Sequence, residues 1–272
     1  MTLNIALVIP DGIVLASDSL ATQMQQIGNQ KMTVQTSCSC GKTESKEIQI
    51  PPQVVPASTW PYAQKVFPVC GVFGLATFGN AFVNFRSIFN HMDELSKRFP
   101  TDDKKEDFFP KISKFIVEYF ENQLKTEWKK SGVNENMMPD TFLPFGFLLC
   151  GYKTNADGDA VPSVNRIFIG KKSVVQEFDG QFGCMPSGDD SVVQILWQKN
   201  TNIANYTAFS LQDAVDYAKF LIRTTADFQR FLGKFPTVGG DIDVALITNQ
   251  VGFRWIAQKP LYRMLEREEK IV

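Results

Sequence analysis

Histidine is nearly absent from this 272-residue chain, which contains only His91. This residue lies in a segment, residues 80–98, whose apolar side chains recur at helical spacing, and we interpret it as a surface or boundary residue of that helix. A single histidine excludes a metal site built from several histidines. It also leaves a Ser-His-Asp or Cys-His catalytic set with only this one residue to use. If the protein is an enzyme, we expect its base to be another group.

Cysteine is also sparse. The five cysteines, Cys38, Cys40, Cys70, Cys150 and Cys184, are an odd number and few for this length, which favours a reducing, cytoplasmic compartment. The first two lie in one polar loop without further cysteine or histidine nearby, so no zinc site is predicted there. We predict no metal and no cofactor.

Charge of one sign and long apolar runs are lacking too. The formal net charge is -1 and the pI is near 6.0, which argues against nucleic acid or an anionic membrane surface as the main partner. No apolar run approaches the roughly 18 residues that a membrane helix needs. Turn residues 10–12 interrupt the N-terminal apolar stretch, so no secretory signal is predicted.

Strand-like and helix-like segments occur in separate blocks: strands, two helices, strands, two helices and strands. Segregated blocks, unlike alternating strands and helices, predict an α+β fold of antiparallel sheets with helices layered outside them, in one domain over residues 1–272. The polar stretch of residues 23–62 has weak periodicity and is predicted to be a long insertion. Helices are expected at 80–98, 106–130, after an opening segment 187–190, and at 210–232. Strands are expected at 3–9, 12–17, 65–69, 72–79, 142–152, 163–170, as a pair around Asp179-Gly180, and at 241–248 and 252–258.

The N-terminal hairpin is expected to bring two polar residues together. If residues 10–12 form its loop, Thr2 lies opposite Leu20, and Asn4 lies opposite Asp18. Even-numbered residues then share a polar face that holds Thr2 and Asp18, while odd-numbered residues form a buried apolar face. The inference depends on the register, because a slip of one residue exchanges the faces.

Thr2 follows the initiator methionine directly. Methionine before a small residue is normally removed in the cytoplasm, and removal would leave Thr2 with a free α-amine whose pKa is about 7.7–8.0. A threonine hydroxyl with its own amine as base needs no histidine. We expect removal of Met1 to be the only maturation step, with no propeptide.

Four segments resemble, in order, motifs of proteasome β-subunits. DGIVLASDSLAT is similar to the family motif DGVVLAADSRAT, and KVFPV with GLATFGNA is similar to its lysine strand and glycine turn. PSGDDSVV resembles its later Ser-Gly segment, and TVGGDIDVALIT resembles its Gly-Gly strand near the C-terminal end. The chain thus resembles an N-terminal-nucleophile (Ntn) hydrolase of the bacterial proteasome-related type. That resemblance implies a four-layer αββα sandwich, with two antiparallel sheets between helix layers.

The resemblance also implies catalytic roles for five residues. Thr2 matches the nucleophile, and Asp18 matches the aspartate that holds the family's lysine, here Lys65. The Lys65 ammonium would lower the effective pKa of the Thr2 hydroxyl or relay its proton. Gly79 matches the backbone N–H that stabilises the oxyanion. Ser187 matches a serine that hydrogen-bonds the α-amine.

Four further residues match substrate-binding positions. The main chain of Thr22 would pair with an extended peptide. The apolar surroundings of Leu20, Ala21 and Thr77 indicate a non-acidic specificity pocket.

The chain also departs from the family pattern. Phe235 stands where the family usually has an aspartate, and Asp189 or Asp190 are candidates to take its place. Leu20 replaces the usual arginine. Residues 23–62 exceed the family's connection in length, and would line or cover the substrate groove or shield Thr2.

Under the resemblance, the expected function is a threonine endopeptidase of a self-compartmentalising assembly. We expect a homo-oligomeric ring or spiral in the cytoplasm, unfolded polypeptide as substrate, and an ATPase unfoldase as a candidate partner. Two alternatives stay open. One is a catalytically inactive proteasome-like scaffold or binding subunit, favoured by Phe235 and by retention of Met1. The other is an Ntn amidase or acylase that acts on small amides.

Overall fold

The structure is a computed structural model that describes residues 2–27, 30–37, 43–50, 53–99, 108–199, 204–233 and 235–259. The chain divides into two compact units. One consists of Met1–Ala21 with Pro61–Val272, and the other of Thr22–Trp60.

The smaller unit consists of paired strands. Strand β3 (Ala21–Ile27) pairs with β6 (Gln53–Trp60), and β4 (Gln30–Ser37) pairs antiparallel with β5 (Thr43–Ile50). No strands were predicted in the polar stretch 23–62. The sequence of this stretch lacks the alternation of apolar and polar residues from which strands are recognised.

The larger unit contains two five-stranded sheets. Their strand orders are β14-β1-β2-β15-β16 and β13-β12-β11-β8-β7, and all neighbouring strands are antiparallel. The strands of the first sheet are β1 (Leu3–Ile9), β2 (Gly12–Asp18), β14 (Gly183–Gly188), β15 (Ile242–Thr248) and β16 (Gly252–Ala257). Those of the second are β7 (Val66–Val69), β8 (Phe73–Gly79), β11 (Phe145–Thr154), β12 (Ala160–Ile169) and β13 (Val174–Asp179).

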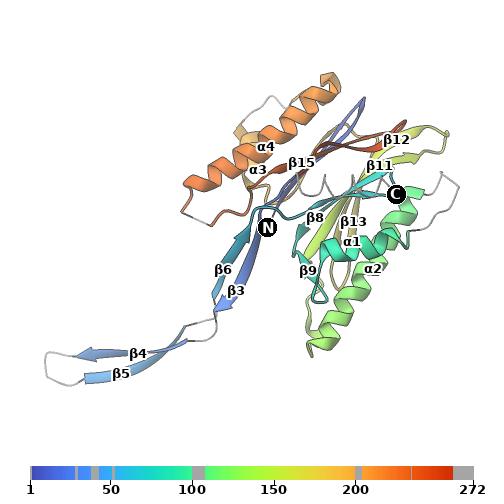
Figure 1. Ribbon diagram of the computed structural model, residues 1–272. Helices are drawn as coiled ribbons and strands as arrows, with labels where there is room; N and C mark the ends of the chain where they lie inside the picture. The colour runs from blue at the N-terminus through green and yellow to red at the C-terminus, as the bar shows by residue number, and fades with distance from the viewer. Residues whose placement is uncertain are drawn as a thin grey trace. The chain divides into compact units, whose positions relative to one another are not determined.

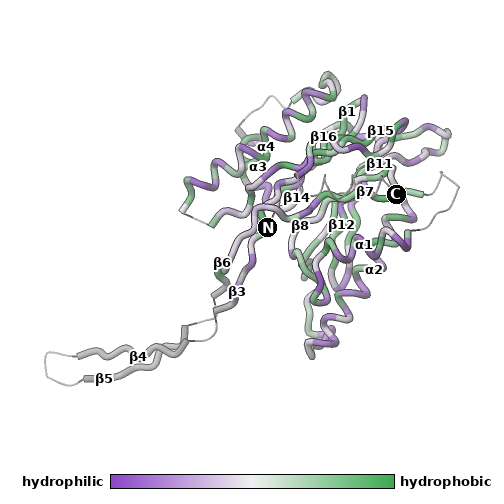
Figure 2. The backbone as a smooth tube through the Cα atoms, in the orientation of Figure 1, coloured by the Kyte–Doolittle hydropathy of each residue, from purple (hydrophilic) through white to green (hydrophobic). Residues whose placement is uncertain are grey.

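Helices cover the outer faces of both sheets (Figure 1). Helices α1 (Ile88–Ser96) and α2 (Phe108–Lys130) pack on the second sheet, whereas α3 (Ser191–Lys199) and α4 (Leu211–Phe231) pack on the first. A third apolar layer lies between the two sheets. Apolar and polar residues alternate along the helices, as expected for helices with one buried face (Figure 2). The predicted α+β fold, a four-layer αββα sandwich, is confirmed. No helix in the described part of the chain combines the length and the apolar character needed to cross a membrane.

The first predicted helix, 80–98, is shorter than expected. Two short strands, β9 (Phe82–Val83) and β10 (Arg86–Ser87), precede α1. The helix begins after Ser87 because the Ser87 side chain caps it, accepting a hydrogen bond from the main-chain nitrogen of Asn90.

His91 is fully buried, so its interpretation as a surface or boundary residue was wrong. Its two ring nitrogens lie 2.9 Å from the Tyr119 hydroxyl and 2.9 Å from the carbonyl oxygen of Val83. Burial lowers the pKa of His91, and the hydrogen bond to Val83 opposes this shift. His91 is therefore a hydrogen-bonded residue of the core between α1 and α2.

The later helices follow the prediction more closely. Helix α2 matches the predicted segment 106–130, although its predicted cap, Thr101 or Asp102, lies outside the described residues. The Ser210–Asp213 capping box of α4 is confirmed. Two short 3-10 helices, Glu135–Met137 and Tyr206–Ala208, complete the described helical segments.

The strand pair predicted around Asp179-Gly180 was wrong. Strand β13 pairs with β12 in the second sheet, whereas β14 pairs with β1 in the first. A turn signal between two strands is compatible with a crossing between sheets as well as with a hairpin. The segment 187–190 also ends β14 before it leads into α3.

The N-terminal hairpin has a register one residue away from the predicted one. Its turn contains only Pro10 and Asp11, so Ile9 pairs with Gly12, and Asn4 pairs with Ser17. A two-residue turn is the commonest connection of a hairpin. The turn propensity of Gly12 predicts a place in the loop, but Gly12 is the first residue of β2.

Both faces of this hairpin are buried. Leu3 and Leu7 pack in the layer under α4, whereas Ile13 and Leu15 lie between the two sheets. The predicted division into an apolar odd face and a polar even face was therefore wrong, because the inner strands of a sandwich are covered on both sides.

Candidate active site

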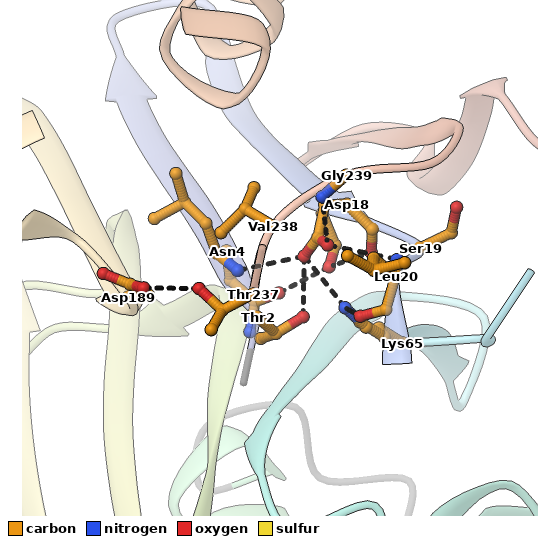
Figure 3. Close-up of polar contacts among 12 residues, drawn as sticks. Thr2, Asn4, Asp18, Ser19, Leu20, Lys65, Asp189, Thr237, Val238 and Gly239 are labelled. Atoms are coloured by element: carbon orange, nitrogen blue, oxygen red, sulfur yellow. Dashed lines mark hydrogen bonds and ion pairs between the residues drawn. The ribbon is translucent and has the colours of Figure 1, made fainter. Parts of the chain in front are cut away.

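A buried aspartate at the end of β2 is the centre of the site. One oxygen of Asp18, Oδ1, accepts hydrogen bonds from the Thr2 hydroxyl at 2.7 Å, the Leu3 main-chain nitrogen at 2.9 Å and Lys65 Nζ at 2.9 Å (Figure 3). Asp18 is fully buried, Thr2 is 2% exposed and Lys65 is 6% exposed. Because the hydroxyl and the lysine nitrogen donate to one oxygen atom, they lie next to each other.

The second oxygen of the carboxylate is held by main-chain groups. Asp18 Oδ2 accepts hydrogen bonds from the nitrogens of Leu20 at 3.1 Å and Gly239 at 3.0 Å. Asp18 thus accepts five hydrogen bonds, so we assign it the role of positioning its neighbours.

The observed register explains how Thr2 reaches Asp18. Asn4 and Ser17 form the last ladder pair of β1 and β2. Beyond that pair the main-chain nitrogen of Leu3 donates to the carboxylate of Asp18 instead of to the opposite main chain. Thr2 and Asp18 meet at this strand end, and not as neighbours on one predicted polar face.

Lys65 lies just before β7 in the second sheet. Its Nζ also donates to the carbonyl oxygen of Leu20 at 2.6 Å. Burial lowers the pKa of Lys65, the Asp18 carboxylate opposes the shift, and the more distant Lys259 ammonium adds to it. A lowered pKa favours the neutral amine, which is able to accept a proton.

A polar connection between the two sheets fixes the main chain around Lys65. The Ser17 hydroxyl donates to Asn4 Oδ1 at 2.6 Å, and Asn4 Nδ2 donates to the Thr77 carbonyl oxygen at 3.0 Å. The main-chain nitrogen of Thr77 in turn donates to the carbonyl oxygen of Lys65 at 2.9 Å. Asn4 and Ser17 were not among the predicted site residues. The available signal was Asn4 within an otherwise apolar strand, and Ser17 directly before Asp18 at the end of another.

The main chain of Thr2 is held from β14. The nitrogen of Asp189 donates to the Thr2 carbonyl oxygen at 2.7 Å. The preceding residue, Gly188, has a φ of +100°, and a Cβ atom there would overlap the Thr2 carbonyl oxygen. Only glycine permits this close approach.

The carboxylate of Asp189 belongs to a second hydrogen-bond network. It accepts from Ser191 Oγ at 2.7 Å, from Gln229 Nε2 at 3.0 Å and from the Thr237 hydroxyl. Gln229 Oε1 accepts from the nitrogens of Thr237 at 2.8 Å and Val238 at 3.0 Å. Partial burial opposes ionisation of Asp189, but the hydrogen bonds led by Thr237 and Ser191 hold its pKa below the ordinary value.

Asp189, and not Phe235, supplies the carboxylate near Thr237. The Phe235 side chain is 47% exposed and has no ionisable group, whereas Asp189 contacts the neighbouring Thr237 from another element. Asp190 accepts a hydrogen bond from Gln194 within α3. Of the two aspartates considered from the sequence, Asp189 is the one that joins the loop leading to Gly239.

Two predicted catalytic residues, Gly79 and Ser187, form no hydrogen bond with Thr2 among the described residues. Gly79 ends β8 with a φ of +86°, and a Cβ atom there would lie 2.5 Å from the Pro144 carbonyl oxygen. Ser187 lies in β14 opposite Asn4. It is 4% exposed, and its hydroxyl has no hydrogen-bond partner among the described residues.

The predicted substrate-binding residues have different surroundings. Leu20 uses both its main-chain nitrogen and its carbonyl oxygen to hold Asp18 and Lys65. Thr77 is buried and supports Lys65 through its main chain. Ala21 and Thr22 begin β3, and Thr22 belongs to the smaller unit.

The site contains a hydroxyl, an amine and a carboxylate without histidine. This set suits activation of a hydroxyl nucleophile. In the part of the chain that the structure describes, no group of His, Cys, Asp and Glu residues is arranged to hold a metal ion.

Comparisons with known proteins give likeness in fold only. No family model matches the chain, and no curated protein matches it. A solved structure of a Gly-1 mutant of Anbu from Hyphomicrobium sp. strain MC1 is similar, with 13% identity and a TM-score of 0.50, over 99% of this chain and 94% of that chain. Anbu from the same strain, in space group C2, has 14% identity and a TM-score of 0.45 over the same shares.

The fold is similar to that of the Gly-1 mutant of Anbu. At this identity the likeness does not extend to individual residues. The candidate site therefore rests on the geometry of this chain, in which Thr2, Asp18 and Lys65 are in contact through one carboxylate oxygen.

Proposed function

We propose that the chain is a threonine-type endopeptidase subunit of a self-compartmentalising, proteasome-like assembly. The observation that carries this proposal is the shared acceptor of the Thr2 hydroxyl and Lys65 Nζ, namely Asp18 Oδ1. The substrate would be unfolded polypeptide in the cytoplasm, delivered to a homo-oligomeric ring or spiral, with an ATPase unfoldase as a candidate supplier.

The reaction would begin after cleavage of the bond between Met1 and Thr2. Thr2 Oγ1 attacks the peptide carbonyl carbon, and its proton passes to the new α-amine, directly or relayed through Lys65. The main-chain N–H of Gly79 would stabilise the oxyanion. The C–N bond then breaks, the leaving amine takes the proton, and an ester on Thr2 remains. Water hydrolyses the ester and restores the hydroxyl.

Asp189 would have a positioning role in this reaction. Its main-chain nitrogen holds the Thr2 carbonyl oxygen, and its carboxylate holds Thr237. Two residues further along, Gly239 donates to Asp18. The contacts thus run from Thr2 through Asp189 and the loop 237–239 back to Asp18, which binds Thr2. In this way Asp189 would support the surroundings of the nucleophile, the role that the family aspartate has at the position of Phe235.

A catalytically inactive scaffold is the second candidate. The 2% exposure of Thr2 favours it, because a nucleophile must be accessible to its substrate. The two functions differ in whether the Thr2 amine is free.

The test is intact mass of the purified protein combined with hydrolysis of fluorogenic peptides and unfolded casein. We expect a mass without Met1, hydrolysis of both substrates, and loss of hydrolysis in Thr2→Ala. Thr207→Ala, at an exposed threonine, is the matched control and should retain full activity. Retained Met1 without hydrolysis would support the scaffold, and hydrolysis restricted to small amides would support an amidase. If Thr2→Ala hydrolysed its substrates as fast as the wild type, Thr2 would not be the nucleophile.

A further inference from the structure

The last buried residue on the inward side of α4 is polar. Leu221, Ile222 and Thr225 are at most 1% exposed, and Gln229, one turn after Thr225, is 7% exposed. Glutamine is mostly found on protein surfaces, whereas an aliphatic side chain of similar size would suit the apolar layer under α4. The contacts of Gln229 explain why a polar side chain is buried there.

Gln229 uses both ends of its side-chain amide. Its Nε2 donates to Asp189 Oδ2 at 3.0 Å and to the Thr237 hydroxyl at 3.0 Å. Its Oε1 accepts from the main-chain nitrogens of Thr237 at 2.8 Å and Val238 at 3.0 Å. Both N–H donors and the carbonyl oxygen of the amide are thus in use. The side chain is held in one orientation, with its nitrogen toward the Asp189 carboxylate and its oxygen toward the loop 237–239.

The first partner of Gln229 leads to the carbonyl side of Thr2. Asp189 accepts the hydrogen bond from Gln229 with its carboxylate, and its main-chain nitrogen donates to the Thr2 carbonyl oxygen at 2.7 Å. Because one residue makes both contacts, a shift of the Asp189 carboxylate is passed to the donor that holds Thr2.

The second partner leads to the hydroxyl side of Thr2. Gly239, in the loop that Gln229 holds, donates to Asp18 Oδ2 at 3.0 Å (Figure 3). Its carbonyl oxygen accepts from the main-chain nitrogen of Leu20 at 2.8 Å. The other oxygen of the Asp18 carboxylate accepts from the Thr2 hydroxyl at 2.7 Å. The loop therefore helps to fix the carboxylate that orients the hydroxyl.

We propose that Gln229 is a positioning residue for the Thr2 nucleophile. It fixes Asp189 and the loop 237–239 against α4, and through them the carbonyl oxygen and the hydroxyl of Thr2. Gln229 touches no reacting atom, so it acts on the geometry of the attack, where a misplacement of about 1 Å costs up to ~10²-fold in rate. The inference rests on the proposed function, because Thr2 is taken as the nucleophile.

Removing the amide tests this role. Gln229→Met keeps the length of the side chain and removes its hydrogen bonds. We expect kcat for peptide hydrolysis to fall at least about tenfold while KM stays within about twofold, because the geometry of attack changes and peptide binding does not. A role in stability alone would lower the free energy of unfolding and leave kcat per folded molecule unchanged. Circular dichroism and urea unfolding give the folded fraction.

Gln229→Glu adds a pH profile that a role in stability alone does not move. The variant keeps the shape of the side chain but replaces the donor to Asp189 by an oxygen. Among the hydrogen bonds of the described residues, Asp189 is the ionisable partner of this side chain, and two adjacent carboxylates raise the pKa of one of them. Below that pKa the introduced carboxyl group is protonated and donates to Asp189 again. We expect kcat at least about tenfold below the wild type at pH 8, and a ratio of variant to wild type that rises at least about threefold by pH 6.

Gln212→Glu is the matched control. Gln212 lies in the first turn of α4, is exposed, and donates through Nε2 to Asp216 Oδ2 at 3.0 Å. It presents the same pair of groups at the other end of the helix. Its kcat should stay within about twofold of the wild type from pH 6 to pH 8, because an exposed charge has little effect.

Amide hydrogen exchange separates a failure of this inference from a failure of the proposed function. The amides that donate to Gln229 lose their acceptor in Gln229→Met and exchange faster in either case. Positioning predicts that the amides of Leu3, Asp189 and Gly239, which hold Thr2 and Asp18, also exchange at least about tenfold faster. Mass spectrometry of the corresponding peptides measures this without any hydrolysis.

Each outcome decides one of the two statements. An inactive wild type would end the proposed function, and unchanged exchange at Leu3, Asp189 and Gly239 would then overturn the positioning role. With an active wild type, unchanged kcat in folded Gln229→Met would overturn it, as would a ratio for Gln229→Glu that does not change with pH. If Gln229→Met does not fold, the pH profile of Gln229→Glu decides.

Discussion

Two buried aspartate–lysine pairs lie near each other in the sandwich, and they differ in what surrounds them. Asp18 pairs with Lys65 at 2.9 Å, and Asp243 pairs with Lys259. All four residues are at most 6% exposed. Asp243 is opposite Ser17 in the ladder of β2 and β15, so the two aspartates come from adjacent places in neighbouring strands.

The surroundings give the pairs different roles. Asp18 accepts hydrogen bonds from separate segments of the chain, and one donor is the hydroxyl of Thr2. Asp243 accepts hydrogen bonds from the side chain and, at 3.0 Å, from the main-chain nitrogen of Lys259, which holds the chain just after β16. A buried ion pair alone therefore does not mark a catalytic site. The hydroxyl beside the first pair is the distinguishing feature.

Removing either carboxylate should have the largest effect. Asp18→Ala leaves Lys65 buried without its counter-ion, so the free energy of unfolding should fall by about 3–5 kcal/mol. Asp243→Ala should also lower the free energy of unfolding, because Lys259 loses this buried carboxylate. Urea unfolding measures both. Only Asp18→Ala should also abolish peptide hydrolysis per folded molecule. If Asp18→Ala were as stable as the wild type, the ion pair between Asp18 and Lys65 would not form in solution.

Neutral replacement of each lysine separates catalysis from stability. Lys65→Met should reduce kcat about 10²–10⁴-fold, the usual contribution of a general acid–base group. Lys259→Met should change kcat less than about threefold, because Lys259 pairs with Asp243, whereas Lys65 pairs with the acceptor of the Thr2 hydroxyl. Steady-state peptide hydrolysis gives both values. Equal losses in the two variants would remove the functional distinction between the pairs.

A third prediction tests whether the main chain of Thr2, beside the Asp18–Lys65 pair, is held tightly in place. Gly188→Ala forces a Cβ atom into the Thr2 carbonyl oxygen, and we expect it to cost about 2–4 kcal/mol of stability. Gly158→Ala has a similar φ of +88° with open space around it, and should cost only about 1–2 kcal/mol. Urea unfolding compares them. Equal costs would mean that the Thr2 carbonyl oxygen is free to move.

The smallest expected effect is a pH dependence of stability. Burial lowers the pKa of Lys65 in the folded chain, while the unfolded value is about 10.4. Between these two pKa values the unfolded chain binds more protons, so stability rises with pH, by at most about 1.4 kcal/mol per pH unit.

Lys65→Met lacks this titration and serves as the reference. The difference in unfolding free energy between the wild type and Lys65→Met should therefore shift in favour of the wild type as the pH rises through that window. Urea unfolding between pH 7 and pH 10 measures it. A difference that stays constant would contradict the lowered pKa of Lys65.

The sequence predicted the layers of the fold and the meeting of Thr2, Asp18 and Lys65. Segregated strand and helix blocks determine the layers, and the motifs resembling proteasome β-subunits indicated the three residues. The hairpin register was wrong because turn propensity does not distinguish a two-residue loop from a three-residue loop. The prediction of a polar face was wrong because both faces of the hairpin are covered by other parts of the chain.

Most of the supporting groups could not be predicted. Leu3, Leu20 and Gly239 contribute main-chain nitrogens, which every residue except proline possesses, so side-chain identity gives no signal. Gln229 lies 40 residues from Asp189 in the sequence, and only the packing of α4 against the first sheet brings them together.

The anchoring of Thr2 has a consequence for how such a protein would be activated. Its carbonyl oxygen is held by Asp189, its hydroxyl by Asp18, and the next main-chain nitrogen by Asp18 as well. None of these bonds involves the α-nitrogen of Thr2. Cleavage of the Met1–Thr2 peptide bond would thus convert the Thr2 amide nitrogen to an amine while these bonds hold the residue in place. That cleavage would need no rearrangement of the hydrogen bonds that hold Thr2.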